Sequence, residues 1–184
     1  MLDRLGTERL TLRALVLDDV DDLVALDSDP AVTPFINGGR PTLRAEMEEI
    51  VCASLDHRWV AVERSTGQFV GWFALRPSDE QRRERELGYR LRRGSWGMGL
   101  ATEGSLAMIA AAFTDLGARR VWAQTMMANT RSRQVMERCG LRHVRTFHLE
   151  WPETIEGTEL GDVEYEILKR DWDAARAPGA DRWH

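Results

Sequence analysis

Hydrophobic residues near the N-terminus change from a strand period to a helical period. At residues 10–14, apolar positions alternate with polar ones, which predicts a strand with one buried face. The acidic pair Asp18-Asp19 then precedes a helical pattern that Asp29-Pro30 ends, and Pro41-Thr42 begins a second predicted helix. The apolar sides of these two helices are Val20, Leu23, Val24 and Leu26 in the first, and Leu43, Met47, Ile50, Val51 and Leu55 in the second.

The middle of the chain predicts a hairpin, a further strand and a long helix. Residues 59–63 and 69–75 are strand-like runs joined by a turn-rich tripeptide, which is typical of an antiparallel hairpin. The mixed-charge run 76–85 predicts a solvated loop before a strand at 86–92. A glycine-rich turn at 94–99 leads into an apolar helix from about Leu100 to Leu116, with Gly117 as its terminator.

The remaining elements complete one domain. A strand at 121–126, a helix at 129–139 and a strand at 141–149 are followed by a loop at 151–162 and a last strand at 163–168. Hairpins followed by a strand–helix–strand–helix–strand unit predict a single α/β (α+β) layered domain with a partly antiparallel sheet, spanning residues 1–176. Residues 177–184 are expected to form a loose tail.

Composition and charge exclude several function classes. The formal net charge is −5, which argues against a general nucleic-acid binder. Lys169 is the only lysine and follows no glycine-rich loop, so a P-loop is excluded. No apolar run is long enough to span a membrane, and no secretory signal is evident. Cys52 and Cys139 lie in helical contexts that predict buried thiols, consistent with a reducing cytoplasm.

The turn at 94–99 is the most informative stretch. Gly97 and Gly99 allow close approach of a ligand to the backbone, and the helix that follows offers unpaired N–H groups and a positive dipole end. This arrangement suits an anionic phosphate, although a tight turn without a ligand would look the same. A dinucleotide fingerprint fits poorly, because Thr102 replaces its third glycine and Gln124-Thr125 stand where its acidic residue belongs.

The segments Glu86–Leu91 and Trp96–Glu103 together resemble the acetyl-CoA pyrophosphate loop of the GCN5-related N-acetyltransferase (GNAT) family. Trp96, Gly99 and Ala101 match the family's Arg/Gln-x-x-Gly-x-Gly/Ala pattern, except that Trp96 replaces Arg or Gln, as is common in the RimJ/RimL-like branch. The opening Thr7–Arg13 resembles that branch too. Residues 129–141 resemble the family's second cofactor motif, so the resemblance covers about residues 7–170.

This resemblance implies a fold, a cofactor and a set of site residues. The implied fold is the GNAT acyltransferase fold, a mixed, mostly antiparallel sheet of about 6–7 strands flanked by about 4 helices. The implied co-substrate is acetyl-CoA. Its expected binding residues are Tyr89, Leu91, Trp96, Gly97, Met98, Gly99, Leu100, Ala101, Thr102, Asn129 and Ser132. The backbone N–H groups of residues 89–91 are expected to hold the acetyl carbonyl.

Two residues are candidates for the chemistry. Asn129 and Ser132 are three apart at a helix start and face one way, with Asn129 also a plausible N-cap. In the family geometry Asn129 binds the pantetheine arm and Ser132 assists the departing thiolate, since the tyrosine that many members use is absent from the following turn. Glu86 is the expected general base for the amine, with Glu84, Glu150 and His148 as substitutes.

Several alternatives remain at this point. Cys139 as an acylated nucleophile is disfavoured, because burial in an apolar helix end would raise its pKa. His143 and His148 face opposite sides of a strand and indicate no metal site. The acidic loop 150–159 would attract a cationic amine, such as a protein N-terminus, an aminoglycoside or a polyamine. Trp151 in that loop could instead serve a homodimer contact. A non-catalytic CoA-sensing module on the same fold is the second hypothesis.

Overall fold

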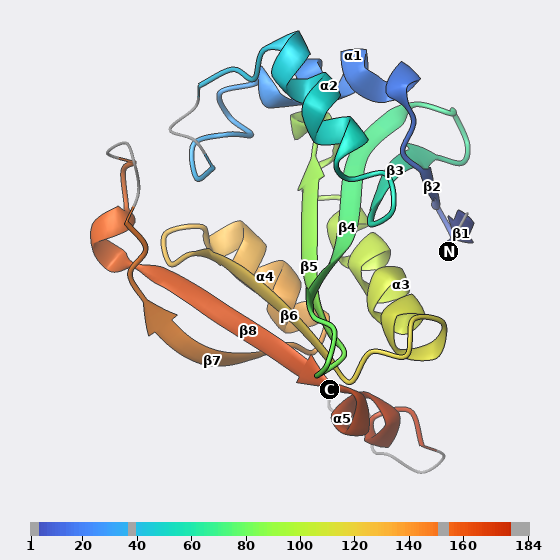
Figure 1. Cartoon of the computed structure of the whole chain (residues 1–184), viewed down its shortest axis with the longest axis vertical. Helices are drawn as coiled ribbons and strands as arrows, with labels where there is room; N and C mark the ends of the chain where they lie inside the picture. The colour runs from blue at the N-terminus through green and yellow to red at the C-terminus, as the bar shows by residue number, and fades with distance from the viewer. Residues whose placement is uncertain (1–3, 37–39, 151–154, 178–184) are drawn as a thin grey trace.

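The computed structural model describes residues 4–36, 40–150 and 155–177. Eight strands in these ranges form one mixed sheet in the order β1-β2-β3-β4-β5-β6-β8-β7 (Figure 1). All neighbouring pairs are antiparallel except β5 and β6, which run parallel. The strands are β1 (Arg4–Gly6), β2 (Leu10–Ala14), β3 (Arg58–Glu63), β4 (Phe69–Asp79), β5 (Glu84–Leu91), β6 (Arg120–Met126), β7 (Arg142–Phe147) and β8 (Asp162–Leu168).

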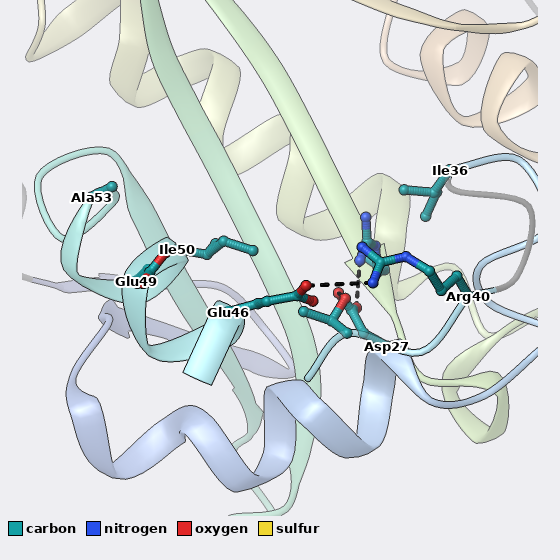
Figure 2. A pocket seen from close by; sticks show the side chains of 9 residues that line it. Asp27, Ile36, Arg40, Glu46, Glu49, Ile50 and Ala53 are labelled. Carbon is teal, nitrogen blue, oxygen red and sulfur yellow. Dashed lines mark hydrogen bonds and ion pairs between the residues drawn. The ribbon is translucent and has the colours of Figure 1, made fainter. Parts of the chain in front are cut away.

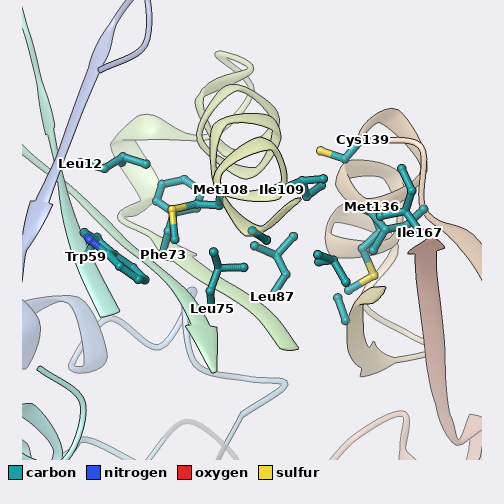
Figure 3. Packing of buried hydrophobic residues seen from close by; sticks show 14 of the residues in the cluster. Leu12, Trp59, Phe73, Leu75, Leu87, Met108, Ile109, Met136, Cys139 and Ile167 are labelled. Carbon is teal, nitrogen blue, oxygen red and sulfur yellow. The ribbon is translucent and has the colours of Figure 1, made fainter. Parts of the chain in front are cut away.

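Helices cover both faces of the sheet. In the described ranges there are five α-helices: α1 (Val20–Asp27), α2 (Arg44–Cys52), α3 (Leu100–Thr114), α4 (Thr130–Arg138) and α5 (Lys169–Ala174). The larger buried cluster joins α3 to the sheet through Met108, Ile109 and Phe73 and continues to Met136 of α4 (Figure 3). On the other face, Val60 of β3 packs with residues of α1 and α2. Strand alternation sends neighbouring side chains of β3 to these two separate clusters.

The sequence predicted the mixed sheet and four of these helices within a few residues of their observed bounds. Beyond the predicted 6–7 strands and 4 helices, the structure adds the three-residue β1 and the six-residue α5, both too short to produce a readable period. It also inserts β8 between β6 and β7, an order that the sequence pattern does not reveal. The expected tail lies outside the described residues, apart from Ala177.

Three sequence predictions are wrong in detail. Most of the run 76–85 is strand rather than loop, because β4 continues to Asp79 and β5 begins at Glu84. Its charges pair across the hairpin, as Arg76 does with Glu86 at 3.2 Å. Three of the five apolar residues assigned to the second helix are exposed, and only the pair one helical turn apart, Met47 and Val51, is buried. The exposed ones are Leu43, Ile50 and Leu55.

Cys52 is also exposed, contrary to the prediction of a buried thiol. It is the last residue of α2 and follows Val51, which occupies the buried side of that helix. Cys139 is buried as predicted.

The parallel strands β5 and β6 pair over a short distance only. Their register joins Glu84 to Arg120 and ends at Glu86 opposite Trp122. Beyond this point the strands separate, and Figure 1 shows β6 and β8 running away from β5 at an angle. The backbone of residues 87–91 therefore has a strand neighbour, β4, on one side alone. This separation opens the middle of the sheet next to the start of α3.

Candidate active site

A cavity of about 690 Å³ lies where β5 and β6 separate. The strand β5, the start of α3, the start of α4 and the segment 31–36 supply its walls. Of the residues predicted to bind the cofactor, all but one line this cavity: Tyr89, Leu91, Trp96, Gly97, Gly99, Leu100, Ala101, Thr102, Asn129 and Ser132. The exception is Met98, whose side chain is half exposed and lies outside the lining.

The turn before α3 has the backbone that its glycines predict. Gly97 and Gly99 both have positive φ, +72° and +78°, which favours glycine at each position. Gly99 is the N-cap of α3, and no side chain caps the helix. The first N–H groups of the helix therefore have no intrahelical acceptor and remain available to an anion. The indole of Trp96 is fixed by a 2.8 Å hydrogen bond from its Nε1 to the carbonyl of Leu91.

The start of α4 forms the opposite wall. The Asn129 side chain caps this helix by accepting a hydrogen bond from the backbone N–H of Ser132 at 3.2 Å. Its amide Nδ2 donates to Thr125 Oγ1 at 3.1 Å. The predicted capping role of Asn129 is confirmed, and the same residue lines the cavity. The guanidinium of Arg131 stacks on the ring of Trp96, and its central carbon lies 4.8 Å from the ring centre.

A tyrosine hydroxyl lies beside Ser132. The Tyr89 hydroxyl is 3.0 Å from both the Ser132 carbonyl oxygen and Ser132 Oγ. Burial raises the pKa of Tyr89, so the phenol keeps its proton at physiological pH. The sequence predicts a backbone contact from Tyr89 to the acetyl-CoA and no catalytic tyrosine at the family position on α4. The strand alternation that sends Leu87, Tyr89 and Leu91 to the α3 side was the available signal.

The predicted base, Glu86, is absent from the lining of this cavity, because strand alternation sends its side chain to the sheet face opposite Tyr89. It is the last β5 residue paired with β6, and its carboxylate is 3.2 Å from Arg76. Three residues of extended strand, about 10 Å, separate it from Tyr89. Of the substitutes, Glu84 is held by Arg120 at 2.8 Å, whereas Glu150 and His148 are exposed and near the residues 151–154 that the structure does not describe. Trp151 falls among those residues.

A second cavity, of about 540 Å³, adjoins the first. Ile36 and Arg90 line both cavities. Figure 2 shows Glu46 and Ile50 of α2 directed toward the space that Asp27 and Arg40 border from the other side, and Glu49 also lines it. Asp27 forms an ion pair with Arg90, and Glu46 pairs with Arg40 at 3.4 Å. Within the described ranges, no ion pair engages Glu49, so this cavity carries an unneutralised carboxylate.

Other reactive groups near the site are inert or absent from it. Burial raises the pKa of the Cys139 thiol to about 12, and its Sγ lies 3.7 Å from the Thr102 carbonyl. A thiol with that pKa carries almost no thiolate at neutral pH, which agrees with the structural role predicted for it. In the part of the chain that the structure describes, no cluster of three potential metal ligands occurs, and no helix has the length and hydrophobicity to cross a bilayer.

The geometry of this cavity is compatible with an acyl-CoA ligand. The uncapped helix start fits a diphosphate, and Asn129 and Ser132 offer polar partners to a pantetheine arm. A family model described as an acetyltransferase (GNAT) domain matches residues 9–142. The chain therefore belongs to the GNAT acetyltransferase family, is an N-acetyltransferase and uses acetyl-CoA as co-substrate.

Relatives and solved structures agree with this assignment. The chain is 32% identical to the FsC-acetyl coenzyme A-N(2)-transacetylase of Aspergillus fumigatus, over 97% of this chain and 81% of the relative. A GNAT-family acetyltransferase from Bacillus anthracis superimposes with a TM-score of 0.78 at 20% identity, covering 91% of this chain and 99% of that one. A spermidine N-acetyltransferase from Vibrio cholerae, in complex with CoA and spermine, has a TM-score of 0.77 at 20% identity, covering 89% and 97%.

The two left-handed glycines at the ends of α3 allow a controlled test of the loop. Gly99→Ala and Gly117→Ala both place a side chain at positive φ and should each cost about 1–2 kcal/mol of stability. Only Gly99 lines the cavity. We expect Gly99→Ala to raise the Kd for acetyl-CoA about ten-fold, equivalent to about 1.4 kcal/mol. Gly117→Ala should leave that Kd unchanged, as measured by titration calorimetry. Equal affinities for the two variants would contradict the binding role of the turn.

Proposed function

We propose that this protein transfers the acetyl group of acetyl-CoA directly to a primary amine within a ternary complex, without an acyl-enzyme. The observation that carries this proposal is the pair of adjoining cavities, one beside the uncapped start of α3 and one bordered by carboxylates, which share Ile36 and Arg90. Acetyl-CoA supplies an activated thioester; transfer forms an amide bond and releases CoA thiolate. No cysteine among the described residues lines either cavity, and burial keeps the Cys139 thiol protonated, which supports direct transfer.

On the leaving-group side, Ser132 is the proposed donor to the departing sulfur. The Tyr89 hydroxyl can donate its proton to either oxygen of Ser132, and this leaves the serine O–H free to point into the cavity. Because both hydroxyls hold their protons far more tightly than a thiol does, they stabilise the thiolate by hydrogen bonding rather than by giving up a proton. Tyr89 is in this account a positioning residue for Ser132.

On the amine side, Glu86 is the proposed general base. A protonated amine cannot attack, so its proton must leave before or during transfer. Glu86 is the last β5 residue paired with β6 and lines neither cavity, so the proton would reach its carboxylate through a relay of water molecules. The backbone N–H groups of residues 89–91, on the strand segment without a second neighbour, are the proposed donors to the acetyl oxygen.

The acceptor we propose is a cationic amine, either a protein N-terminus or a small molecule such as a polyamine. The unneutralised Glu49 in the second cavity supports a cationic group there. The Vibrio cholerae neighbour carries spermine in its crystal structure, which supports the small-molecule choice. The opening Thr7–Arg13 and Trp96 at the loop support placement in the RimJ/RimL-like branch, which favours the protein N-terminus.

An acceptor panel tests the function. We expect CoA thiol release from acetyl-CoA to require an added amine, and mass spectrometry to show a gain of one acetyl group on that amine. The panel should include spermidine, an amino acid and peptides with free N-termini. Binding of acetyl-CoA without thiol release for any amine would instead support a CoA-sensing module. Preference for a dinucleotide over acetyl-CoA in calorimetry would contradict both functions.

The pair Tyr89 and Ser132 should behave as one unit in catalysis. Ser132→Ala removes a hydrogen bond to a developing charge, worth about 1.5–3 kcal/mol, so kcat should fall about 10- to 100-fold. Tyr89→Phe should lower kcat by less, and should have almost no further effect when combined with Ser132→Ala. The Kd for acetyl-CoA should change little in all three variants. Independent, additive losses in the double variant would show that Tyr89 does not act through Ser132.

The role of Glu86 has a pH signature. Glu86→Gln should lower kcat/KM at neutral pH about 100-fold, in the range of general base catalysis. The defect should shrink at higher pH, where solvent deprotonates the amine. Arg76→Gln, which removes the ion-pair partner but keeps the carboxylate, is the matched control and should retain most activity. Initial rates between pH 6 and pH 10 provide the comparison, and a pH-independent defect in Glu86→Gln would remove Glu86 as the base.

A further inference from the structure

Arg9, near the N-terminus, is tied to the glycine turn and to the first turn of α3. Its Nε lies 2.6 Å from Glu103 Oε2, and its backbone N–H donates to Glu103 Oε1 at 2.8 Å. A second guanidinium nitrogen, Nη1, donates to the carbonyl oxygen of Met98 at 2.7 Å. The Thr7 hydroxyl completes the cluster by donating to Glu103 at 2.5 Å. These bonds join residues about ninety positions apart in the sequence.

The third guanidinium nitrogen of Arg9 lies against the turn itself. A Cβ added to Gly99 would be 3.4 Å from Arg9 Nη2. Arg9 is absent from the lining of the cavity, so it contacts the turn from outside. The backbone of Met98 and Gly99 is thus held between the cavity and this guanidinium. This explains why Met98 lies outside the cavity while its carbonyl group is firmly anchored.

Glu103 poses an electrostatic difficulty for an anion-binding helix start. Burial alone would raise its pKa, but hydrogen bonds from Thr7 and from Arg9 outweigh this and hold the pKa of Glu103 below its ordinary value. The carboxylate is therefore charged at neutral pH, in the first turn of the helix that faces the cavity. An unpaired negative charge there would repel a diphosphate, and the guanidinium of Arg9 neutralises it.

We propose that Arg9 is a positioning residue for the phosphate-bearing half of acetyl-CoA. Its guanidinium fixes the Met98–Gly99 turn by donating to the Met98 carbonyl oxygen, and it neutralises the charge of Glu103. This inference rests on the diphosphate position assumed in the proposed function. Through Arg9, the opening Thr7–Arg13 segment contributes to cofactor binding, although it takes no part in the chemistry of acetyl transfer.

The test compares a complete and a truncated acetyl donor. Arg9→Gln should raise the Kd for acetyl-CoA about ten-fold or more, with kcat at saturating acetyl-CoA nearly unchanged. With S-acetylpantetheine, which carries the thioester but no phosphate, kcat/KM should be the same for Arg9→Gln and the unmodified protein. A purely structural role would impair both donors alike.

Two further variants separate charge from folding. Arg64→Gln is the matched control. Arg64 donates to the carbonyl oxygen of Thr7, which belongs to the same segment as Arg9, at 2.8 Å. No hydrogen bond or ion pair joins Arg64 to the described residues of the glycine turn. Arg64→Gln should leave both donors unaffected. Adding Glu103→Gln to Arg9→Gln removes the unpaired carboxylate, so the double variant should bind acetyl-CoA more tightly than Arg9→Gln alone.

The outcomes that overturn the proposal are distinct from those that overturn the function. An unchanged Kd in Arg9→Gln, an equal loss with S-acetylpantetheine, or no recovery in the double variant would each reject the role of Arg9. Failure of the unmodified protein to bind acetyl-CoA would reject the proposed function instead. Thermal unfolding of all variants shows whether each is folded at the assay temperature.

Discussion

The site depends on how little β5 and β6 pair. Three residue pairs join these parallel strands, from Glu84 with Arg120 to Glu86 with Trp122. The guanidinium of Arg120 fastens this end by contacting Glu84 of β5 at 2.8 Å and Glu164 and Glu166 of β8 at 2.5 and 2.6 Å. One partly buried cation thus joins three strands where β5 and β6 are paired. The strands can separate beyond that point without losing the continuity of the sheet.

The separation gives the two cavities different environments. On the α3 side, the cavity is bordered by the uncapped start of α3, neutral hydroxyls and the cationic side chains of Arg131 and Arg138. On the α2 side, charged side chains dominate, with Asp27, Glu46 and Glu49 facing Arg40 and Arg90. Arg90 also stacks on Trp72, 5.3 Å from the ring centre, so its side chain is held by an aromatic face as well as by Asp27. The boundary between the cavities is therefore a fixed cation.

The sequence predicted the local elements of this site better than their assembly. The turn at Gly97 and Gly99, the capping role of Asn129 and the burial of Cys139 follow from local conformational and burial preferences, and the structure has each of them. The Tyr89–Ser132 contact joins residues 43 positions apart on a strand and a helix, so no local pattern encodes it. The contact of Arg9 with Glu103 spans 94 positions and was equally hidden. The mixed charges of residues 76–85 predicted a loop where the structure has mostly strand, because exposed strands can carry oppositely charged cross-strand pairs.

The two cysteines differ in a way that bears on oxidation. Thiol oxidants and alkylating agents react with thiolates, and the Cys139 thiol, with a pKa of about 12 and its sulfur against the start of α3, offers almost none. Cys52 is exposed at the end of α2, between Ile50 and Ala53, which both border the second cavity. Oxidative damage and covalent labels would thus concentrate on the helix that borders the second cavity, while the junction between α3 and α4 keeps its packing.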